Sequence, residues 1–168
     1  MKHGYAPVGS LILRLLLLTT VVAALALASA QTTAKAAAID DLPPGSPQVI
    51  QPEELAQTLK ASGAQKPLIL YVGPKAFYAQ AHIPGAEFIG PVGKPEDMVK
   101  LLARASSLPR DGAVVIYCGC CPWDHCPNIR PAFAELKKVG FTKVRVLYLA
   151  TSFGADWKDK GFPVASGD

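Results

Sequence analysis

This chain of 168 residues lacks most of the patterns that assign a function directly. It has no block of lysine and arginine with interleaved aromatic residues, so a nucleic-acid partner has little support. Outside the first 30 residues, 15 basic residues stand against 13 acidic ones, and this net charge of +2 indicates no polyanionic partner. The cysteines do not form the paired, widely spaced Cys-x-x-Cys units of structural zinc sites. No internal repeat is present, and the length fits one domain with a real core.

The first 30 residues are predicted to be a signal peptide. Lys2 and Arg14 supply a basic region, the segment from Leu15 to Ala28 is uncharged and apolar, and Ala28-Ser29-Ala30 is a small-x-small cleavage site. Cleavage would start the mature chain at Gln31, in the periplasm or outside the cell, with no stable membrane insertion. The alternative is an uncleaved membrane anchor, but the apolar stretch after Arg14 is short for a span of roughly 20 residues.

A single folded domain is predicted over residues 48–165, after a flexible linker at residues 31–47 that ends rich in proline and glycine. Apolar segments of strand length alternate with segments of helical periodicity along this domain. The alternation predicts a three-layer α/β domain in which helices flank a mainly parallel central sheet. Strands are expected at Val49–Ile50, Pro67–Val72, Phe88–Ile89, Ala113–Tyr117 and Val144–Leu147. Helices are expected to begin near Pro52, Lys75, Glu96 and Asn128, and the expected core includes Phe133, Leu136, Val144, Val146 and Trp157.

All four cysteines, Cys118, Cys120, Cys121 and Cys126, fall within nine residues between an expected strand and an expected helix. This is the carboxyl edge of the sheet, where ligands bind in parallel α/β domains. Backbone N–H groups and the dipole at the start of the helix favour negative charge, so at least one of these thiols is expected to ionise readily. A thiolate is a nucleophile and a metal ligand, and the function is expected to use one of these two roles.

Three segments of the chain carry a family resemblance. They are Ala81-His82-Ile83-Pro84-Gly85-Ala86, the strand from Val114 to Cys118 with a following helix that ends at Gly140-Phe141, and Trp157 with Gly161-Phe162-Pro163-Val164. Together they resemble the rhodanese-like domains, a family that includes single-domain sulfurtransferases, over residues 49–164. The resemblance implies that Cys118 takes the outer sulfur of a small anionic donor such as thiosulfate, forms a persulfide, and passes the sulfur to a thiol acceptor without a cofactor. Loop amides and the helix dipole would lower the pKa of Cys118 and stabilise its persulfide.

The same resemblance suggests which residues around Cys118 bind the substrate. Arg130, in the first turn of the helix, would attract the anionic donor, although it also fits a surface ion pair. Trp123 would roof a pocket or pin the loop, and His125 would carry a proton or be solvated. Asn128 fits a helix N-cap, and His82 is expected to order its turn through hydrogen bonds. The full set of candidate substrate-binding residues is Gly119, Trp123, His125, Asn128 and Arg130.

The chain departs from the family pattern in three places. Its cysteine loop is longer and contains two prolines, Tyr71-Val72-Gly73 stands where the family has Asp-Val-Arg, and three of its cysteines are additional. The additional thiols leave two further functions open. One is dithiol redox chemistry, in which Cys121 or Cys126 displaces a sulfur held on Cys118. The other is a module without catalysis that binds a partner protein or holds a metal through Cys118, Cys121, His125 and Cys126, with Cys120 as a further thiol.

The spacing of the loop residues bears on two further possibilities, a disulfide and a phosphatase site. A disulfide among Cys120, Cys121 and Cys126 is as plausible as catalysis in an oxidising compartment, although the adjacent pair is unfavourable. A phosphatase is disfavoured by spacing, because its phosphate cradle needs a cysteine six positions before an arginine, and the residue six before Arg130 is Asp124. The sequence gives no oligomeric state.

Overall fold

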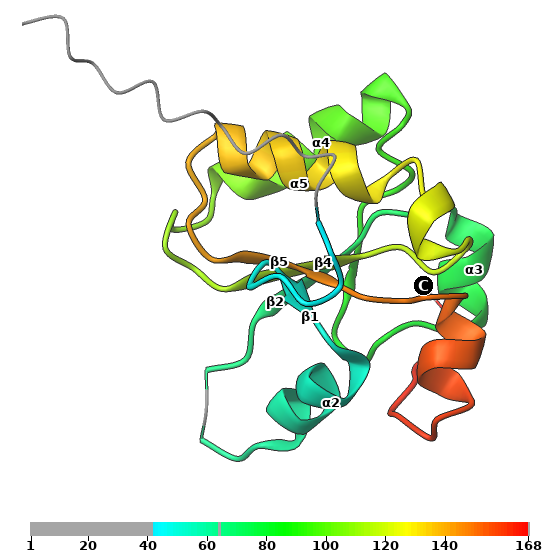
Figure 1. Ribbon diagram of the computed structural model, residues 1–168. Coiled ribbons are helices and arrows are strands. Elements are labelled where there is room, and N and C mark those ends of the chain that lie inside the picture. Colours follow the sequence, from blue (N-terminus) through cyan, green and yellow to red (C-terminus); the bar gives the residue numbers. More distant parts are fainter. Residues whose placement is uncertain (1–41, 64, 168) are drawn as a thin grey trace, which may run out of the picture. The chain divides into compact units, whose positions relative to one another are not determined.

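The computed structural model describes residues 42–63 and 65–167 of the chain (Figure 1). The predicted signal peptide and residues 31–41 of the predicted linker lie outside this part. Within it, no helix combines the length and the apolar character that a membrane crossing needs.

A five-stranded parallel sheet forms the centre of the domain. Its order is β1-β5-β4-β2-β3, and every pairing between these strands is parallel. The bounds are β1 Val49–Ile50, β2 Leu68–Tyr71, β3 Glu87–Phe88, β4 Val114–Tyr117 and β5 Val144–Leu147. The prediction of a mainly parallel sheet is confirmed, and the central position of β4 places the loop that follows it at the middle of the carboxyl edge.

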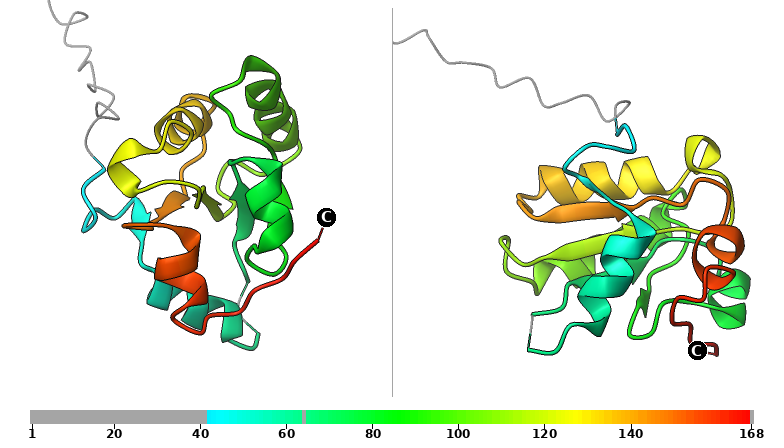
Figure 2. Two further views of the ribbon diagram at one scale, coloured as in Figure 1. Left: turned by 90° about the vertical axis from the view of Figure 1, so that its right-hand side faces the viewer. Right: turned by 60° about the horizontal axis from the view of Figure 1, so that its bottom comes forward.

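Helices cover both faces of this sheet, which confirms the predicted three layers. On one face α4 (Pro95–Ser106) and α5 (Ile129–Lys138) lie side by side, as the left view of Figure 2 shows. The other face carries α2 (Pro52–Lys60), α3 (Lys75–Gln80) and a single π-helical turn, Gly154–Lys158. Each of the four expected helices is present near its predicted start, whereas the π-helical turn has no counterpart among the expected elements.

The alternation of side chains along β4 explains why its sequence is apolar throughout. Val114 and Ile116 contribute to the core beneath α4 and α5, whereas Val115 and Tyr117 contribute to the core on the opposite face. A strand that is covered on both sides has no position for an exposed polar residue. The residues predicted to be in the core are all buried: Phe133, Leu136, Val144, Val146 and Trp157.

Two tertiary features close the domain at its ends. Leu42, inside the predicted linker, is buried in the α4 and α5 core, so packed structure begins before residue 48. At the other end, an antiparallel bridge joins His82 to Ala165, and the His82 ring stacks on Tyr78 with centroids 3.8 Å apart. The Nδ1 atom of His82 also lies 2.8 Å from the Tyr78 carbonyl oxygen. His82 therefore orders its turn through hydrogen bonds, as predicted.

Candidate functional site

The cysteine loop spans residues 118–128, between the end of β4 and the start of α5. Cys118 is the first residue after β4, and a 3-10 turn from Trp123 to His125 divides the loop. The chain that leaves the neighbouring strand β2 passes beside it at Gly73. The site therefore lies where the sequence placed it, at the carboxyl ends of two adjacent central strands.

The Cys118 sulfur lies in a tight, largely enclosed environment. Its side chain is 4 % exposed, and its Sγ lies 3.3 Å from Cys120 Sγ. The Asn128 Nδ2 group donates a hydrogen bond to it over 3.7 Å. A Cβ atom built on Gly73 would lie only 2.9 Å from the Cys118 sulfur and 2.6 Å from the Tyr71 hydroxyl. Only glycine leaves room at position 73 for both groups.

The departure from the family's Asp-Val-Arg segment therefore has a structural meaning. Tyr71 is 1 % exposed and joins a cluster of aromatic rings with Tyr78, Phe88 and Tyr117. Its hydroxyl donates to the Pro74 carbonyl oxygen at 3.3 Å, and burial raises its pKa well above the ordinary value. A packed neutral tyrosine and a glycine thus replace the acid and base of the family pattern, and the glycine brings the backbone against the Cys118 sulfur.

The pKa values of the two buried thiols Cys118 and Cys126 shift in opposite directions, and Cys118 does not have the lowered pKa that was expected of it. A hydrogen bond from Cys118 lowers the pKa of Cys126 to about 6, and the backbone N–H groups of Asn128 and Ile129 add to this effect. The same hydrogen bond, together with burial, raises the pKa of Cys118 far above its ordinary value. The amides at the start of α5 favour a thiolate, as predicted, but they act on Cys126, three residues before the first residue of α5, and not on Cys118 at the end of β4.

The four cysteines are free thiols that form a contact network. Cys120 Sγ lies 3.5 Å from Cys121 Sγ as well as 3.3 Å from Cys118 Sγ, and these three sulfurs lie within 4.8 Å of one another. Burial and a hydrogen bond to Cys120 raise the pKa of Cys121 to about 12. Of the four residues suggested as metal ligands, Cys118 and Cys121 belong to this three-sulfur group, whereas Cys126 and the exposed His125 do not.

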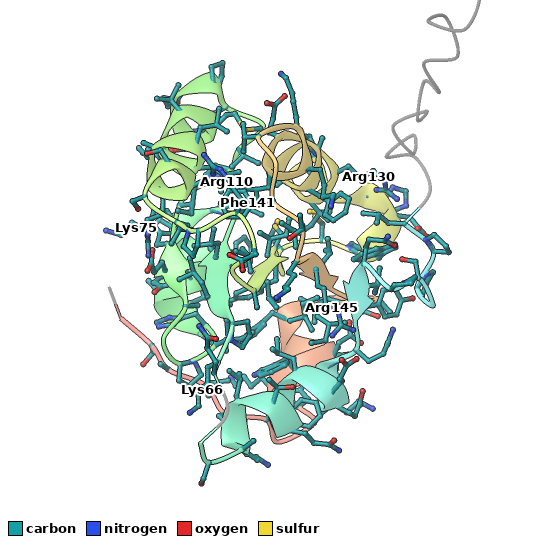
Figure 3. The ribbon with its side chains drawn as sticks, turned by 90° about the vertical axis from the view of Figure 1, so that its left-hand side faces the viewer. Lys66, Lys75, Arg110, Arg130, Phe141 and Arg145 are labelled. Atoms are coloured by element: carbon teal, nitrogen blue, oxygen red, sulfur yellow. The ribbon has the colours of Figure 1, made fainter. Side chains whose placement is uncertain are left out.

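The other candidate residues take different positions. Asn128 occupies the N-cap position of α5, but its side chain makes no cap hydrogen bond. Its Oδ1 atom accepts from the Gly93 N–H at 3.0 Å, and its Nδ2 group faces Cys118. The N-cap interpretation is therefore wrong for the side chain, because both of its polar atoms are used to hold the loop. Arg130 is half-buried in the first turn of α5 (Figure 3).

Two cavities adjoin the cysteine loop, and the candidate residues divide between them. The smaller has a volume of about 10 Å³ and is lined by Cys118, Cys121, Trp123, Cys126, Ile129, Leu147 and Leu149. Trp123 lines this cavity and is buried, and its ring packs edge-on against Tyr148, which anchors the loop. The larger has a volume of about 290 Å³ and is lined by Tyr71, Phe77, Gln80, Ala81, Gly119, Cys120, Ser152, Phe153, Gly154 and Lys158. His125 and Arg130 line neither cavity.

Several residues of the larger cavity were not found by sequence reasoning. Ser152, Phe153 and Lys158 lie after β5, at least 26 residues beyond the last cysteine, Cys126. They reach the site because the Phe153 N–H donates to the Gly119 carbonyl oxygen at 3.1 Å and the Phe153 side chain lies against Gly119. A Cβ atom on Gly119 would lie 2.5 Å from Phe153 Cβ. The signal in the sequence was the rule that loops after adjacent parallel strands share one edge.

Comparisons with known proteins agree with this architecture. The family model of the rhodanese-like domain matches residues 51–151. The Alr3790 protein from Anabaena sp. is 23% identical with a TM-score of 0.54, over 70% of this chain and 82% of that chain. The BH2092 protein from Bacillus halodurans is 21% identical with a TM-score of 0.53, over 70% and 76%. A thiosulfate sulfurtransferase from Pseudomonas aeruginosa is 25% identical with a TM-score of 0.50, over 71% of this chain and 19% of that chain. No curated protein matches the chain.

Proposed function

Because this chain belongs to the rhodanese-like domain family, we propose that it is an exported sulfurtransferase that carries sulfane sulfur as a persulfide on Cys118. The observation that carries the proposal is the set of groups around the Cys118 sulfur. The Asn128 amide donates to it, a cavity of about 10 Å³ adjoins it, and the neighbouring thiol Cys126 has a lowered pKa. That volume has room for about one water-sized group, which is close to the size of one added sulfur atom.

The first half of the reaction loads one sulfur atom. The Cys118 proton passes to the Cys126 thiolate, and the Cys118 sulfur attacks the outer sulfur of the donor. The S–S bond of the donor breaks, and its leaving group departs with the electron pair; for thiosulfate this group is sulfite. The Asn128 N–H group and the Cys120 backbone N–H face the Cys118 sulfur and stabilise negative charge that develops there.

The second half returns the site to its starting state. A thiolate acceptor attacks the outer sulfur of the Cys118 persulfide, and the bond between the two sulfurs breaks. The Cys118 sulfur keeps the electron pair of that bond and takes its proton back from Cys126. The acceptor leaves as a persulfide, so sulfur is transferred without net oxidation of the protein.

Turnover of the mature protein with thiosulfate and a thiol acceptor tests this proposal. We expect Cys118→Ser to abolish turnover and to prevent the gain of one sulfur atom that intact mass spectrometry detects in the loaded wild type. Serine differs from cysteine only in having oxygen in place of sulfur, and the change in volume is smaller than one methylene group. We therefore expect the fold to be retained, and circular dichroism provides the control. Equal rates for the two proteins would eliminate Cys118 as the sulfur carrier.

A dithiol redox reaction is the second candidate, and the hydrogen bond between Cys118 and Cys126 favours it. The Cys126 thiolate would attack the inner sulfur of the Cys118 persulfide, form a disulfide with Cys118, and release sulfide. This step oxidises the two protein thiols and reduces the sulfane sulfur, so an external dithiol must then reduce the disulfide. Sulfide release in single turnover without an acceptor thiol would support this candidate, whereas a stable loaded protein would exclude it.

The rival outside enzyme chemistry is a module that binds a soft metal, and the three-sulfur group of Cys118, Cys120 and Cys121 is the observation in its favour. Metal analysis of protein purified without chelator tests it. Absence of metal, and an unchanged unfolding midpoint with chelator, would exclude the rival.

Export is the remaining part of the proposal, and it rests on the leader pattern of residues 1–30. Cell fractionation and N-terminal sequencing test it. A mature chain that begins at Gln31 supports periplasmic or secreted protein, whereas an intact leader in the membrane fraction supports the anchor.

A further inference from the structure

The burial of Cys118 raises a question of access. Its side chain is 4 % exposed, and the cavity at its sulfur, about 10 Å³, holds about one water-sized group. A small donor such as thiosulfate reaches Cys118 with its outer sulfur alone, whereas a larger organic donor does not fit beside it. If Cys118 also receives sulfur from a larger donor, a more accessible thiol must pass the sulfur on.

Cys120 is placed to provide that step. It is half-buried, and it lines the larger cavity of about 290 Å³, which neither Cys118, Cys121 nor Cys126 lines. Its Sγ lies 3.3 Å from Cys118 Sγ, in van der Waals contact. Cys120 is therefore the thiol of this loop that faces both a ligand-sized space and the enclosed sulfur.

The walls of the larger cavity indicate the class of ligand. Its volume is at the lower end of the roughly 300–1,000 Å³ range of small-molecule sites, larger than a small inorganic anion needs. Tyr71, Phe77 and Phe153 give it aromatic walls, and Phe77 is 47 % exposed, so its ring is accessible to a ligand in the cavity. Lys158 supplies a positive charge at the same cavity. This combination suits an organic molecule that carries a carboxylate.

Building on the proposed function, we propose that Cys120 takes sulfane sulfur from a low-molecular-weight organic persulfide with a carboxylate, bound in the 290 Å³ cavity, and relays it to Cys118. The relay divides the work of the loop between two thiols. Cys120 reacts with the donor in the larger cavity, and Cys118 holds the sulfur at the smaller cavity.

Each step of the relay exchanges one S–S bond for another, so no oxidant is needed. The Cys120 thiolate attacks the outer sulfur of the donor persulfide, the donor S–S bond breaks, and the donor thiolate leaves with the electron pair. Cys118 then attacks the outer sulfur on Cys120 while its proton passes to Cys126. The S–S bond on Cys120 breaks, and Cys120 leaves as a thiolate. This second attack requires Cys120 to rotate about χ1, so that its outer sulfur faces the Cys118 sulfur.

Rapid-quench loading of the mature protein with glutathione persulfide tests the relay. Alkylation followed by peptide mass spectrometry locates the added sulfur in wild type, Cys118→Ser and Cys120→Ser. We expect the sulfur on Cys118 in wild type and on Cys120 in Cys118→Ser. In Cys120→Ser we expect the loading of Cys118 to slow at least about tenfold, because no thiol then lies within reach of a donor bound in the larger cavity. The unfolding midpoint of each variant shows whether it is folded.

Three results would overturn the relay. They are loading of Cys120→Ser at the wild-type rate, sulfur on Cys121 or Cys126 in Cys118→Ser, or a Cys118–Cys120 disulfide with released sulfide in wild type. The relay and the proposed function fail separately. If Cys120→Ser is fully active while Cys118→Ser is inactive, only the relay is wrong, and if wild type gains no sulfur from either glutathione persulfide or thiosulfate, the proposed function fails.

Lys158 provides an independent check of the ligand class. We expect Lys158→Gln to raise the KM for glutathione persulfide severalfold and to leave kcat unchanged, because the lysine contacts the carboxylate and not the reacting sulfur. Lys160→Gln, a nearby exposed lysine that does not line the cavity, is the matched control. Equal KM values for Lys158→Gln and the control would show that the cavity does not recognise a carboxylate through this residue and would remove that part of the proposal.

Discussion

Replacing Cys126 with serine tests the division of roles between the two buried thiols. Cys126 is 7 % exposed and has a lowered pKa, whereas the pKa of its partner Cys118 is raised. If the Cys126 thiolate accepts the proton of Cys118, persulfide formation requires Cys126 to be deprotonated. The rate should then rise with pH through the pKa of Cys126, which is about 6, and reach a plateau above it.

The size of the effect follows from this pKa. At pH 7 a group with a pKa of about 6 is roughly nine-tenths ionised, whereas a thiol with an ordinary pKa near 8.5 is only a few per cent ionised. Serine keeps the size of the side chain but cannot accept a proton at this pH. Because a positioned base contributes about 10²–10⁴-fold to a rate, we expect Cys126→Ser to slow persulfide formation at pH 7 by about 10²-fold.

Stopped-flow or rapid-quench measurement of persulfide formation between pH 5 and 9 provides the assay. In wild type we expect an inflection near pH 6, and in Cys126→Ser we expect that inflection to disappear. Unfolding in urea is the control. The depressed pKa of Cys126 contributes stability that is lost as the pH falls through about 6, so wild type should lose more stability than the variant in this window. The same inflection and rate in both proteins would refute the assignment of Cys126 as the base.

Two further substitutions test the walls of the site. Gly73→Ala places a methyl group 2.9 Å from the Cys118 sulfur and 2.6 Å from the Tyr71 hydroxyl, so we expect a loss of about 1–3 kcal/mol in unfolding free energy and slower persulfide formation. Urea unfolding at wild-type stability would contradict this packing. Asn128→Asp keeps the acceptor for the Gly93 N–H but replaces the donor to Cys118 with a negative charge. We expect the pH–rate inflection to move upward, and an unmoved inflection would show that the Asn128 side chain does not sense the thiolate.

The fold was largely predictable from the sequence because its signals are local. The apolar runs of strand length and the periodic segments between them gave the three-layer architecture and the position of β4. The π-helical turn that carries Lys158 was not predicted, since its five residues are too short for a periodicity signal and its position depends on packing of Trp157.

The site was predicted less completely, for two physical reasons. All four cysteines follow β4 closely in the sequence, and this indicated that they lie near the carboxyl edge of the sheet. Which sulfur the amides of α5 contact depends on how the loop between Cys118 and Cys126 folds back. Asn128 has the sequence position of a cap, yet its side chain is turned inward because Gly93 arrives from a distant loop. Both outcomes are set by tertiary contacts that no short window of sequence contains.

The small chamber behind Trp123 has a consequence for the lifetime of the loaded protein. If Cys118 carries a persulfide, as proposed, its outer sulfur occupies this small cavity, and the buried side chains of Trp123 and Cys126 limit its contact with large reductants. This sulfur should leave only by transfer to a thiol that can contact it. The loaded protein should therefore survive purification and release its sulfur when it meets the acceptor. The cavity would then favour slow loss of the bound sulfur over rapid turnover.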